Sequence, residues 1–343
     1  MEDKKIASLC SYIPIEIVEA SGFGYERIID DNEVIDTKIK GIFPTYMCSF
    51  ASHCLNKLCN DFNKYEAIVF TNSCHPLESV YESIKRMHNE ATVFMLNVPR
   101  GQSEEAIEYF SMELKRFIGF LEKKLSITIS LDKIKDAVIK YNNRRNLFNK
   151  LHDLIRNKEI ILSAKEIKQL NDYYMQSGNE YEKMIQEIID SKDNRISDSS
   201  VSRILLSGNL CVPRDILDII EEYDANVVLC NTCDGFRSVA SFIETEGDII
   251  KNIAKAYLNK PACLRCKDMN LKLSQFEKYL DEYSINGAIF SVMKFCTDQT
   301  YWIVGVEKIL KEKKIPFLFI DSDYSLESSG QIHTRIQAFL ENL

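Results

Sequence analysis

The chain has 343 residues, of which 45% are hydrophobic and 27% are charged, and its formal net charge is −8. This length is enough for two domains, and the composition is typical of a soluble globular protein. The negative charge argues against nucleic-acid or anionic-membrane binding, because both need a positive surface. No run of 18 apolar residues and no signal-peptide core occurs, so we expect a cytoplasmic protein.

The 11 cysteines are the most informative feature of the composition. Disulfides are disfavoured in the cytoplasm, so this odd number indicates thiols and metal ligands. Cys74, Cys233 and Cys296 follow short apolar runs that are typical of strands, and Cys48 lies in the loop before the first of these runs. Thiols gathered from separate loops can hold a metal cluster, although any single cysteine is more often core filler.

The first predicted unit is an α/β domain over residues 1–131. Residues 66–71 and 91–96 are β-branched and almost purely apolar, as in strands buried on both faces. A long helix should begin after Ser103, with acids in its first turn and an apolar stripe from Ile107 to Leu125. This order of elements predicts a doubly wound, parallel sheet.

Residues 132–200 predict a helical linking segment, and a second α/β domain follows over residues 201–343. Its expected strands occupy residues 203–208, 226–230, 287–293 and 315–320, with helices after Pro213 and over residues 301–313. We therefore predict two Rossmann-like (flavodoxin-like) doubly wound domains. Such sheets bind ligands at the carboxyl ends of their strands, where Cys48, Cys74 and Cys296 could meet.

Two Cys-x-x-Cys units offer an alternative metal site. Cys230 with Cys233 and Cys263 with Cys266 could supply four thiolates to a structural zinc ion. The 29 residues between them exceed the usual spacing of about 15–20, so zinc is a remote alternative. The phosphate-binding Gly-x-x-x-x-Gly-Lys-Ser/Thr and the nucleophile motif Gly-x-Ser-x-Gly are both absent from the sequence.

A set of short motifs, in order along nearly the whole chain, resembles the 2-hydroxyacyl-CoA dehydratase and benzoyl-CoA reductase superfamily, in particular the D-component of 2-hydroxyglutaryl-CoA dehydratase. The motifs are Pro14-Ile-Glu16, Cys48-Ser-Phe-Ala-Ser-His-Cys54, Asn72-Ser-Cys74, Leu96-Asn-Val-Pro-Arg100, Tyr141-Asn-Asn-Arg144, Cys233-Asp-Gly235, Lys294-Phe-Cys296 and Asp321-Ser-Asp323-Tyr324 leading to Gly330-Gln331 and Arg335.

The resemblance implies a [4Fe–4S] cluster on Cys48, Cys74 and Cys296, with the fourth iron open to another ligand. It further implies that an ATP-hydrolysing iron–sulfur activator delivers one low-potential electron. The (R)-2-hydroxyacyl-CoA thioester then becomes a ketyl radical anion, which expels its hydroxyl and yields enoyl-CoA. Such enzymes are commonly heterodimers of related subunits, and this chain resembles the smaller one, for which the resemblance implies a role in relaying electrons while the partner binds the substrate. Arg100, Arg144 and Arg335 are candidates to meet CoA phosphates or the activator, with solvated surface positions or structural ion pairs as the alternatives.

Cys10, Cys233 and Cys266 resemble positions of the double-cubane branch, whose homodimers carry an [8Fe–9S] cluster and reduce small molecules. Where that branch has Gly-Cys-Pro, this chain has Ser207-Gly208-Asn209, with Cys211 displaced. A non-catalytic electron-transfer subunit is the third possibility. We assign packing roles to the remaining thiols, which are Cys54, Cys59, Cys211, Cys230 and Cys263.

Overall fold

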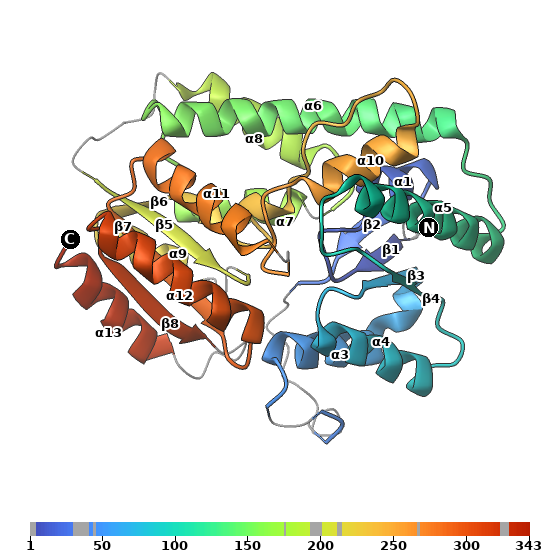
Figure 1. Cartoon of the computed structure of the whole chain (residues 1–343), viewed down its shortest axis with the longest axis horizontal. Coiled ribbons are helices and arrows are strands. Elements are labelled where there is room, and N and C mark those ends of the chain that lie inside the picture. The colour runs from blue at the N-terminus through green and yellow to red at the C-terminus, as the bar shows by residue number, and fades with distance from the viewer. Residues whose placement is uncertain are drawn as a thin grey trace. The chain divides into compact units, whose positions relative to one another are not determined.

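The structure, a computed structural model, describes residues 5–29, 41–43, 46–174, 176–192, 201–210, 215–265, 268–322 and 329–343. The chain forms two compact units, each assembled from three segments. Unit 1 consists of Met1–Arg145, Met175–Ser177 and Val239–Lys260, and unit 2 of Asn146–Tyr174, Gly178–Ser238 and Pro261–Leu343. Among the described residues, each unit holds one parallel sheet of four strands (Figure 1), which confirms the predicted α/β fold of two Rossmann-like domains.

The sheet of unit 1 has the strand order β2-β1-β3-β4, and all of its strand pairs are parallel. Its strands are β1 (Lys5–Ser8), β2 (Gly24–Arg27), β3 (Tyr65–Thr71) and β4 (Val93–Leu96). The continuous apolar run of β3 is buried from Ala67 to Thr71, as expected for a central strand between two layers of helices. The predicted strands at 66–71 and 91–96 are therefore β3 and β4.

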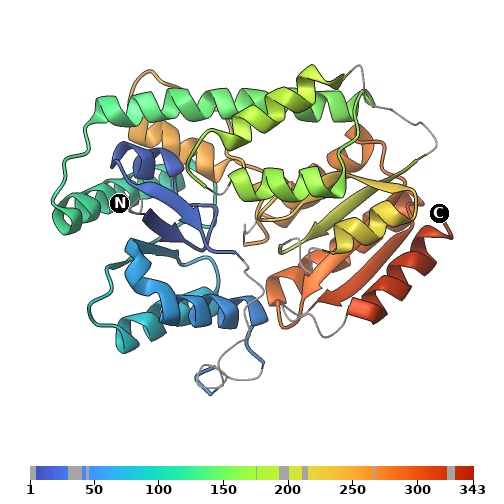
Figure 2. The same ribbon diagram turned by 180° about the vertical axis from the view of Figure 1, so that it is seen from behind.

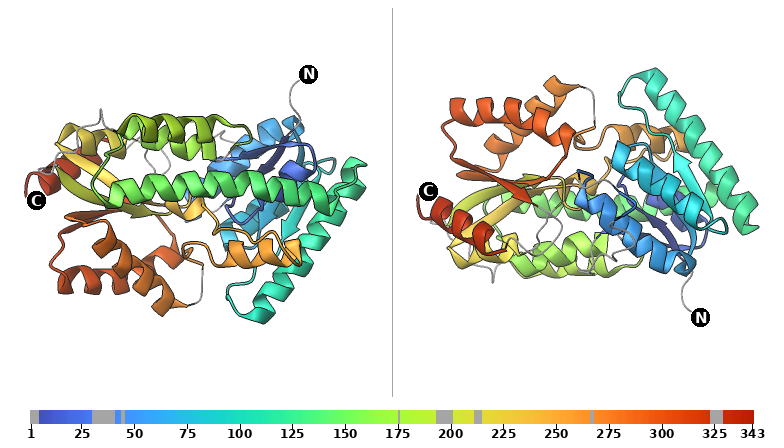
Figure 3. Two further views of the ribbon diagram at one scale, coloured as in Figure 1. Left: turned by 90° about the horizontal axis from the view of Figure 1, so that it is seen from above. Right: turned by 90° about the horizontal axis from the view of Figure 1, so that it is seen from below.

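Helices cover the sheet of unit 1, and α5 shows why these residues form helices where they do. Ser103 caps α5 through its Oγ, which accepts a hydrogen bond from Ala106 N at 3.3 Å. Glu104 and Glu105 occupy the first turn, where the helix dipole favours negative charge. The helices of this unit are α1 (Ile15–Ala20), α3 (Ser49–Asp61), α4 (His75–Met87), α5 (Glu104–Leu125), α10 (Ile249–Leu258) and the first part of α6 (Leu131–Arg156), which is one uninterrupted helix (Figure 3).

Unit 2 repeats the topology of unit 1, because its strand order is β6-β5-β7-β8 and all pairs are again parallel (Figure 2). The strands are β5 (Ser202–Gly208), β6 (Ala225–Asn231), β7 (Gly287–Met293) and β8 (Phe317–Ser322). The helices are the remainder of α6, α7 (Ala164–Tyr174), α8 (Glu180–Asp190), α9 (Ile216–Glu222), α11 (Met269–Glu282), α12 (Thr297–Glu312) and α13 (Ser329–Leu340). Pro213, predicted to start a helix, lies outside the described residues.

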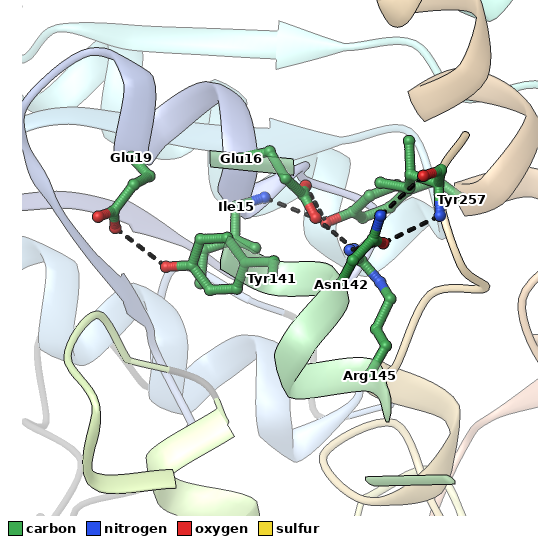
Figure 4. A network of polar contacts seen from close by, with 8 residues as sticks. Ile15, Glu16, Glu19, Tyr141, Asn142, Arg145 and Tyr257 are labelled. Atoms are coloured by element: carbon green, nitrogen blue, oxygen red, sulfur yellow. Dashed lines mark hydrogen bonds and ion pairs between the residues drawn. The ribbon is translucent and has the colours of Figure 1, made fainter. Parts of the chain in front are cut away.

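A buried polar network ties distant segments of unit 1 together (Figure 4). Glu16 on α1 is 0% exposed and forms an ion pair with the Arg145 guanidinium on α6, whose side chain is 2% exposed. The Tyr257 hydroxyl on α10 donates to the other Glu16 oxygen at 2.8 Å and accepts from Ile15 N at 3.1 Å. The buried charge of Glu16 is thereby balanced by groups from two other helices.

The same network explains part of the Tyr141-Asn-Asn-Arg144 motif. The Asn142 amide donates to Ile243 O at 2.8 Å and accepts from Ile243 N at 3.0 Å. The Tyr141 hydroxyl donates to a Glu19 oxygen at 3.0 Å, and the Arg144 guanidinium lies 4.7 Å from the Tyr141 ring centre. Arg144 is only 1% exposed, so in this structure it is a core residue of unit 1. Among the described residues, none of the helices combines the length and apolar character that a membrane crossing requires.

Candidate functional site

Thiols gather at the carboxyl ends of the strands in both units. In unit 1, Cys10 follows β1 and Cys74 follows β3; in unit 2, Cys233 follows β6 and Cys296 follows β7. Open parallel sheets bind their ligands at this edge, because loops and helix N-termini converge there. These four cysteines therefore lie at the edge of the sheet where proteins of this fold bind their ligands.

The strand order that both sheets share gives each of them a topological switch point at its carboxyl edge. In unit 1 the chain leaves β1 toward β2 on one side and then crosses to β3 on the other, which creates a topological switch point between β1 and β3. Cys10 and Cys74 follow these two strands. In unit 2 the equivalent strands are β5 and β7, which are followed by Asn209 and Cys296.

Cys48 and Cys74 are the N-cap residues of α3 and α4. These two helices contact each other, and both thiols pack against one hydrophobic cluster that includes Leu55 and Val80. Because α3 leads into the start of β3 and α4 leaves its end, both helices begin at the carboxyl edge of the sheet. Helix N-termini present unpaired N–H groups and a partial positive charge, which favour a thiolate over a thiol.

Cys296 is the N-cap residue of α12 in unit 2. The Asn209 side-chain N–H donates to its Sγ at 3.1 Å, and the same amide accepts from Met293 N at 3.2 Å, so Asn209 bridges the switch point. Burial raises the pKa of the Cys296 thiol, and the Asn209 hydrogen bond opposes this effect. Phe295, just before it, has φ of 65°, a left-handed conformation that costs a bulky residue about 1–2 kcal/mol.

A pair of thiols in unit 2 joins the two Cys-x-x-Cys units. Cys263 is hydrogen-bonded to Cys233, and this bond together with burial raises the pKa of the Cys263 thiol. The Arg237 Nη2 lies 3.7 Å from the Cys233 Sγ, and Cys233 N donates to Asn209 O at 2.8 Å. From the sequence, Cys263 was expected to have a packing role, and neither Asn209 nor Arg237 was expected to contact a thiol. The repeated Cys-x-x-Cys spacing was the only signal for Cys263.

The other cysteines have simpler surroundings. Cys54 and Cys59 lie within α3, where burial raises the pKa of Cys59 to about 11, and Cys230 lies within β6. Cys211 and Cys266, the latter a second-cubane candidate, fall outside the described residues. Within the ranges that the structure describes, no three His, Cys, Asp or Glu side chains are grouped closely enough to hold a metal ion.

Comparison with known proteins connects the chain with one family. Residues 10–343 match the family described as 2-hydroxyglutaryl-CoA dehydratase, D-component. The chain belongs to this family. The family resemblance expected from the ordered motifs is thereby confirmed over nearly the whole length.

Curated relatives align with almost the full chain. The (R)-phenyllactyl-CoA dehydratase beta subunit of Clostridium sporogenes is 24% identical, covering 99% of this chain and 92% of the relative. The lactoyl-CoA dehydratase subunit beta of Anaerotignum propionicum is 21% identical, with 97% and 90% covered. The (R)-2-hydroxyglutaryl-CoA dehydratase subunit beta of Acidaminococcus fermentans is 22% identical, with 99% and 92% covered. The prediction of a dehydratase-type lyase subunit is confirmed.

Proposed function

We propose that the chain is the iron–sulfur subunit of an enzyme that dehydrates an (R)-2-hydroxyacyl-CoA to the enoyl-CoA. The observation that carries the proposal is the equivalent placement of the three nominated ligands. Cys48, Cys74 and Cys296 are each the N-cap residue of a helix at the carboxyl edge of a parallel sheet. The names of the relatives, which act on phenyllactyl-, lactoyl- and 2-hydroxyglutaryl-CoA, support the substrate class.

The residues fit the chemistry of a [4Fe–4S] cluster. Thiolates are soft, anionic ligands, and the helix N-termini and the Asn209 N–H stabilise negative charge on sulfur. The hydrophobic cluster behind Cys48 and Cys74 excludes water from one side of these thiols. A [4Fe–4S] cluster bound to these thiols would carry one electron at a time, and one of its irons would be available as a Lewis acid.

The proposal includes partners. An ATP-dependent iron–sulfur activator would deliver the electron, and a paralogous dehydratase subunit would complete a cytoplasmic heterodimer that binds acyl-CoA. The alternative is a homodimeric reductase with an [8Fe–9S] double cubane that also uses Cys10, Cys233 and Cys266. One observation supports the double-cubane alternative, because Asn209 contacts both Cys296 and Cys233. The remaining alternative is a subunit that relays electrons and has no catalytic role.

The test is anaerobic purification followed by iron and sulfide analysis and electron paramagnetic resonance. About four iron atoms per chain support a single cubane and about eight support the double cubane. Cys48→Ser, Cys74→Ser and Cys296→Ser should each lose the cluster signal. Cys59→Ser, on the same helix as Cys48 but away from its N-terminus, is the matched control and should keep its iron. Stoichiometric zinc without sulfide, or equal iron loss in all four variants, contradicts the assignment.

A further inference from the structure

The turn that joins β7 to α12 places Cys296 beside the end of β5. Cys296 N donates to Met293 O at 3.1 Å, so residues 293–296 form a hydrogen-bonded turn. The strands β5 and β7 are neighbours in one parallel sheet (Figure 1), and β5 ends at Gly208. Asn209, the next residue along the chain, therefore lies beside the start of this turn.

The side-chain amide of Asn209 holds both ends of the turn. Its Oδ1 accepts from Met293 N at 3.2 Å, and its Nδ2 donates to the Cys296 Sγ at 3.1 Å. The Met293 N–H can only donate, so the amide oxygen has to face it and the amide N–H has to face the sulfur. The main chain of Asn209 is held as well, because Asn209 O accepts from Cys233 N at 2.8 Å. The fold therefore fixes the direction of this donor.

An N–H donor has a defined effect on a thiolate that binds iron. The donor stabilises negative charge on sulfur, and an iron–sulfur cluster gains one negative charge when it takes up an electron. A hydrogen bond to a ligand sulfur therefore favours the reduced state and raises the reduction potential. The main-chain N–H of Gln299 is a second donor to Cys296, and it remains in place when Asn209 is replaced.

We propose that Asn209 is a positioning residue of the iron–sulfur site, whose N–H group orients the Cys296 sulfur and raises the reduction potential of the cluster bound there. The inference rests on the proposed function, because it requires a cluster at Cys296. It adds a residue that is not a ligand and whose substitution changes electron transfer rather than iron binding. A raised potential makes the site a better acceptor for the electron that the proposed reaction needs.

Asn209→Asp is the most direct test, because it changes the group that faces the sulfur. The carboxylate keeps an oxygen for Met293 N, but it replaces the N–H donor with a second oxygen and adds negative charge. We expect the reduction potential to fall by at least about 59 mV, which for a one-electron couple is a tenfold shift toward the oxidised state. The measurement is an anaerobic redox titration of the full-length protein, followed by electron paramagnetic resonance. Asn209→Ala removes the donor without adding charge, and it should lower the potential by a smaller amount.

Asn286→Asp is the matched control. Asn286 lies just before β7, and its Oδ1 accepts from Arg203 N at 2.8 Å, which an aspartate oxygen can also do. The same charge is thereby added at the amino end of a strand of seven residues, about 20 Å from its carboxyl end. This variant should have the native reduction potential.

The outcomes separate this inference from the proposed function. A native protein without iron and sulfide contradicts the proposed function, and the inference falls with it. A native protein that holds the cluster, with an unchanged potential in Asn209→Asp and Asn209→Ala, contradicts the inference alone. Equal shifts in Asn209→Asp and Asn286→Asp also contradict it, because the effect would then come from charge and not from the hydrogen bond. Loss of the iron from both Asn209 variants contradicts it as well, because Asn209 would then be needed for iron binding itself.

Discussion

Glu16 carries its charge at a fully buried position and depends on two partners. Glu16→Gln leaves the Arg145 guanidinium buried without this carboxylate, so we expect a loss of about 3–5 kcal/mol in unfolding free energy. The double variant Glu16→Leu/Arg145→Met removes both charges and should recover most of that loss. Urea denaturation monitored by circular dichroism measures both effects.

An exposed ion pair of the same unit provides the control for Glu16. Glu108, whose side chain is 57% exposed, pairs with Lys251 at 3.3 Å, and Glu108→Gln should cost under about 1 kcal/mol. If Glu16→Gln costs no more than Glu108→Gln, the buried network is not what holds α1, α6 and α10 together.

His152 gives unit 2 a pH-dependent stability. The Tyr283 hydroxyl accepts from Arg156 at 2.9 Å and is hydrogen-bonded to His152 Nδ1 at 2.8 Å, while burial and the Arg156 charge lower the His152 pKa to about 3. The unfolded chain takes up this proton below about pH 6.5 and the folded chain does not, so stability falls as the pH falls from 6.5 toward 3.

The pH dependence can be measured by urea unfolding at pH 7 and pH 5. We expect a loss of about 1–2 kcal/mol attributable to His152, which His152→Phe should remove. His333→Asn is the control, because His333 lies at the surface with its side chain 39% exposed. A His152→Phe protein with the native pH slope would contradict this account.

At the scale of elements, continuous apolar runs predicted the central strands, including β3, β5 and β7. The strands β1 and β2 have only four residues each, too few for an alternating pattern to stand out, and only the sheet pairing reveals them. The helix α3 was not predicted either, so Cys48 was expected in a loop and is found as the N-cap of a helix.

The candidate site was predictable only in part. Thiols after apolar strands are visible in the sequence, and Cys74 and Cys296 could be nominated from local order alone. Asn209 and Arg237 carry no such signal, because their importance comes from contacts with Cys296 and Gly208, which are distant from them in the chain. Polar residues of this kind look like ordinary surface positions until the fold surrounds them.

The strand pair β5–β7 depends on a glycine. A Cβ on Gly208 would lie 2.1 Å from the main-chain oxygen of Ser291, so Gly208→Ala must push the two strands apart. We expect a loss of about 1–3 kcal/mol, measured by thermal or urea denaturation. Gly119→Ala on α5 is the control, and its effect on the free energy of unfolding should have the opposite sign. Nothing lies within 4 Å of the added Cβ, so this substitution should stabilise the protein by about 0.5–1 kcal/mol.

At the scale of the whole molecule, the two units are interleaved along the chain. Unit 1 takes residues Val239–Lys260 from far downstream, and their helix α10 packs against α5 and carries Tyr257. A chain cut after residue 200 should therefore lack a cooperative thermal transition by near-ultraviolet circular dichroism. Joining residues 236–262 to it through a flexible linker should restore the transition. Cooperative melting of the cut chain at the native temperature would refute this dependence.

The Glu16–Tyr257 hydrogen bond also fixes an order of events during protein synthesis. The two residues are 241 positions apart, so at about 5–20 residues per second the ribosome needs about 12–48 s to make the second after the first. Throughout that time the carboxylate of Glu16 on α1, which is buried in the finished protein, has no hydroxyl partner. The thiols of Cys48 and Cys74 leave the ribosome in this interval, within a unit that is not yet complete.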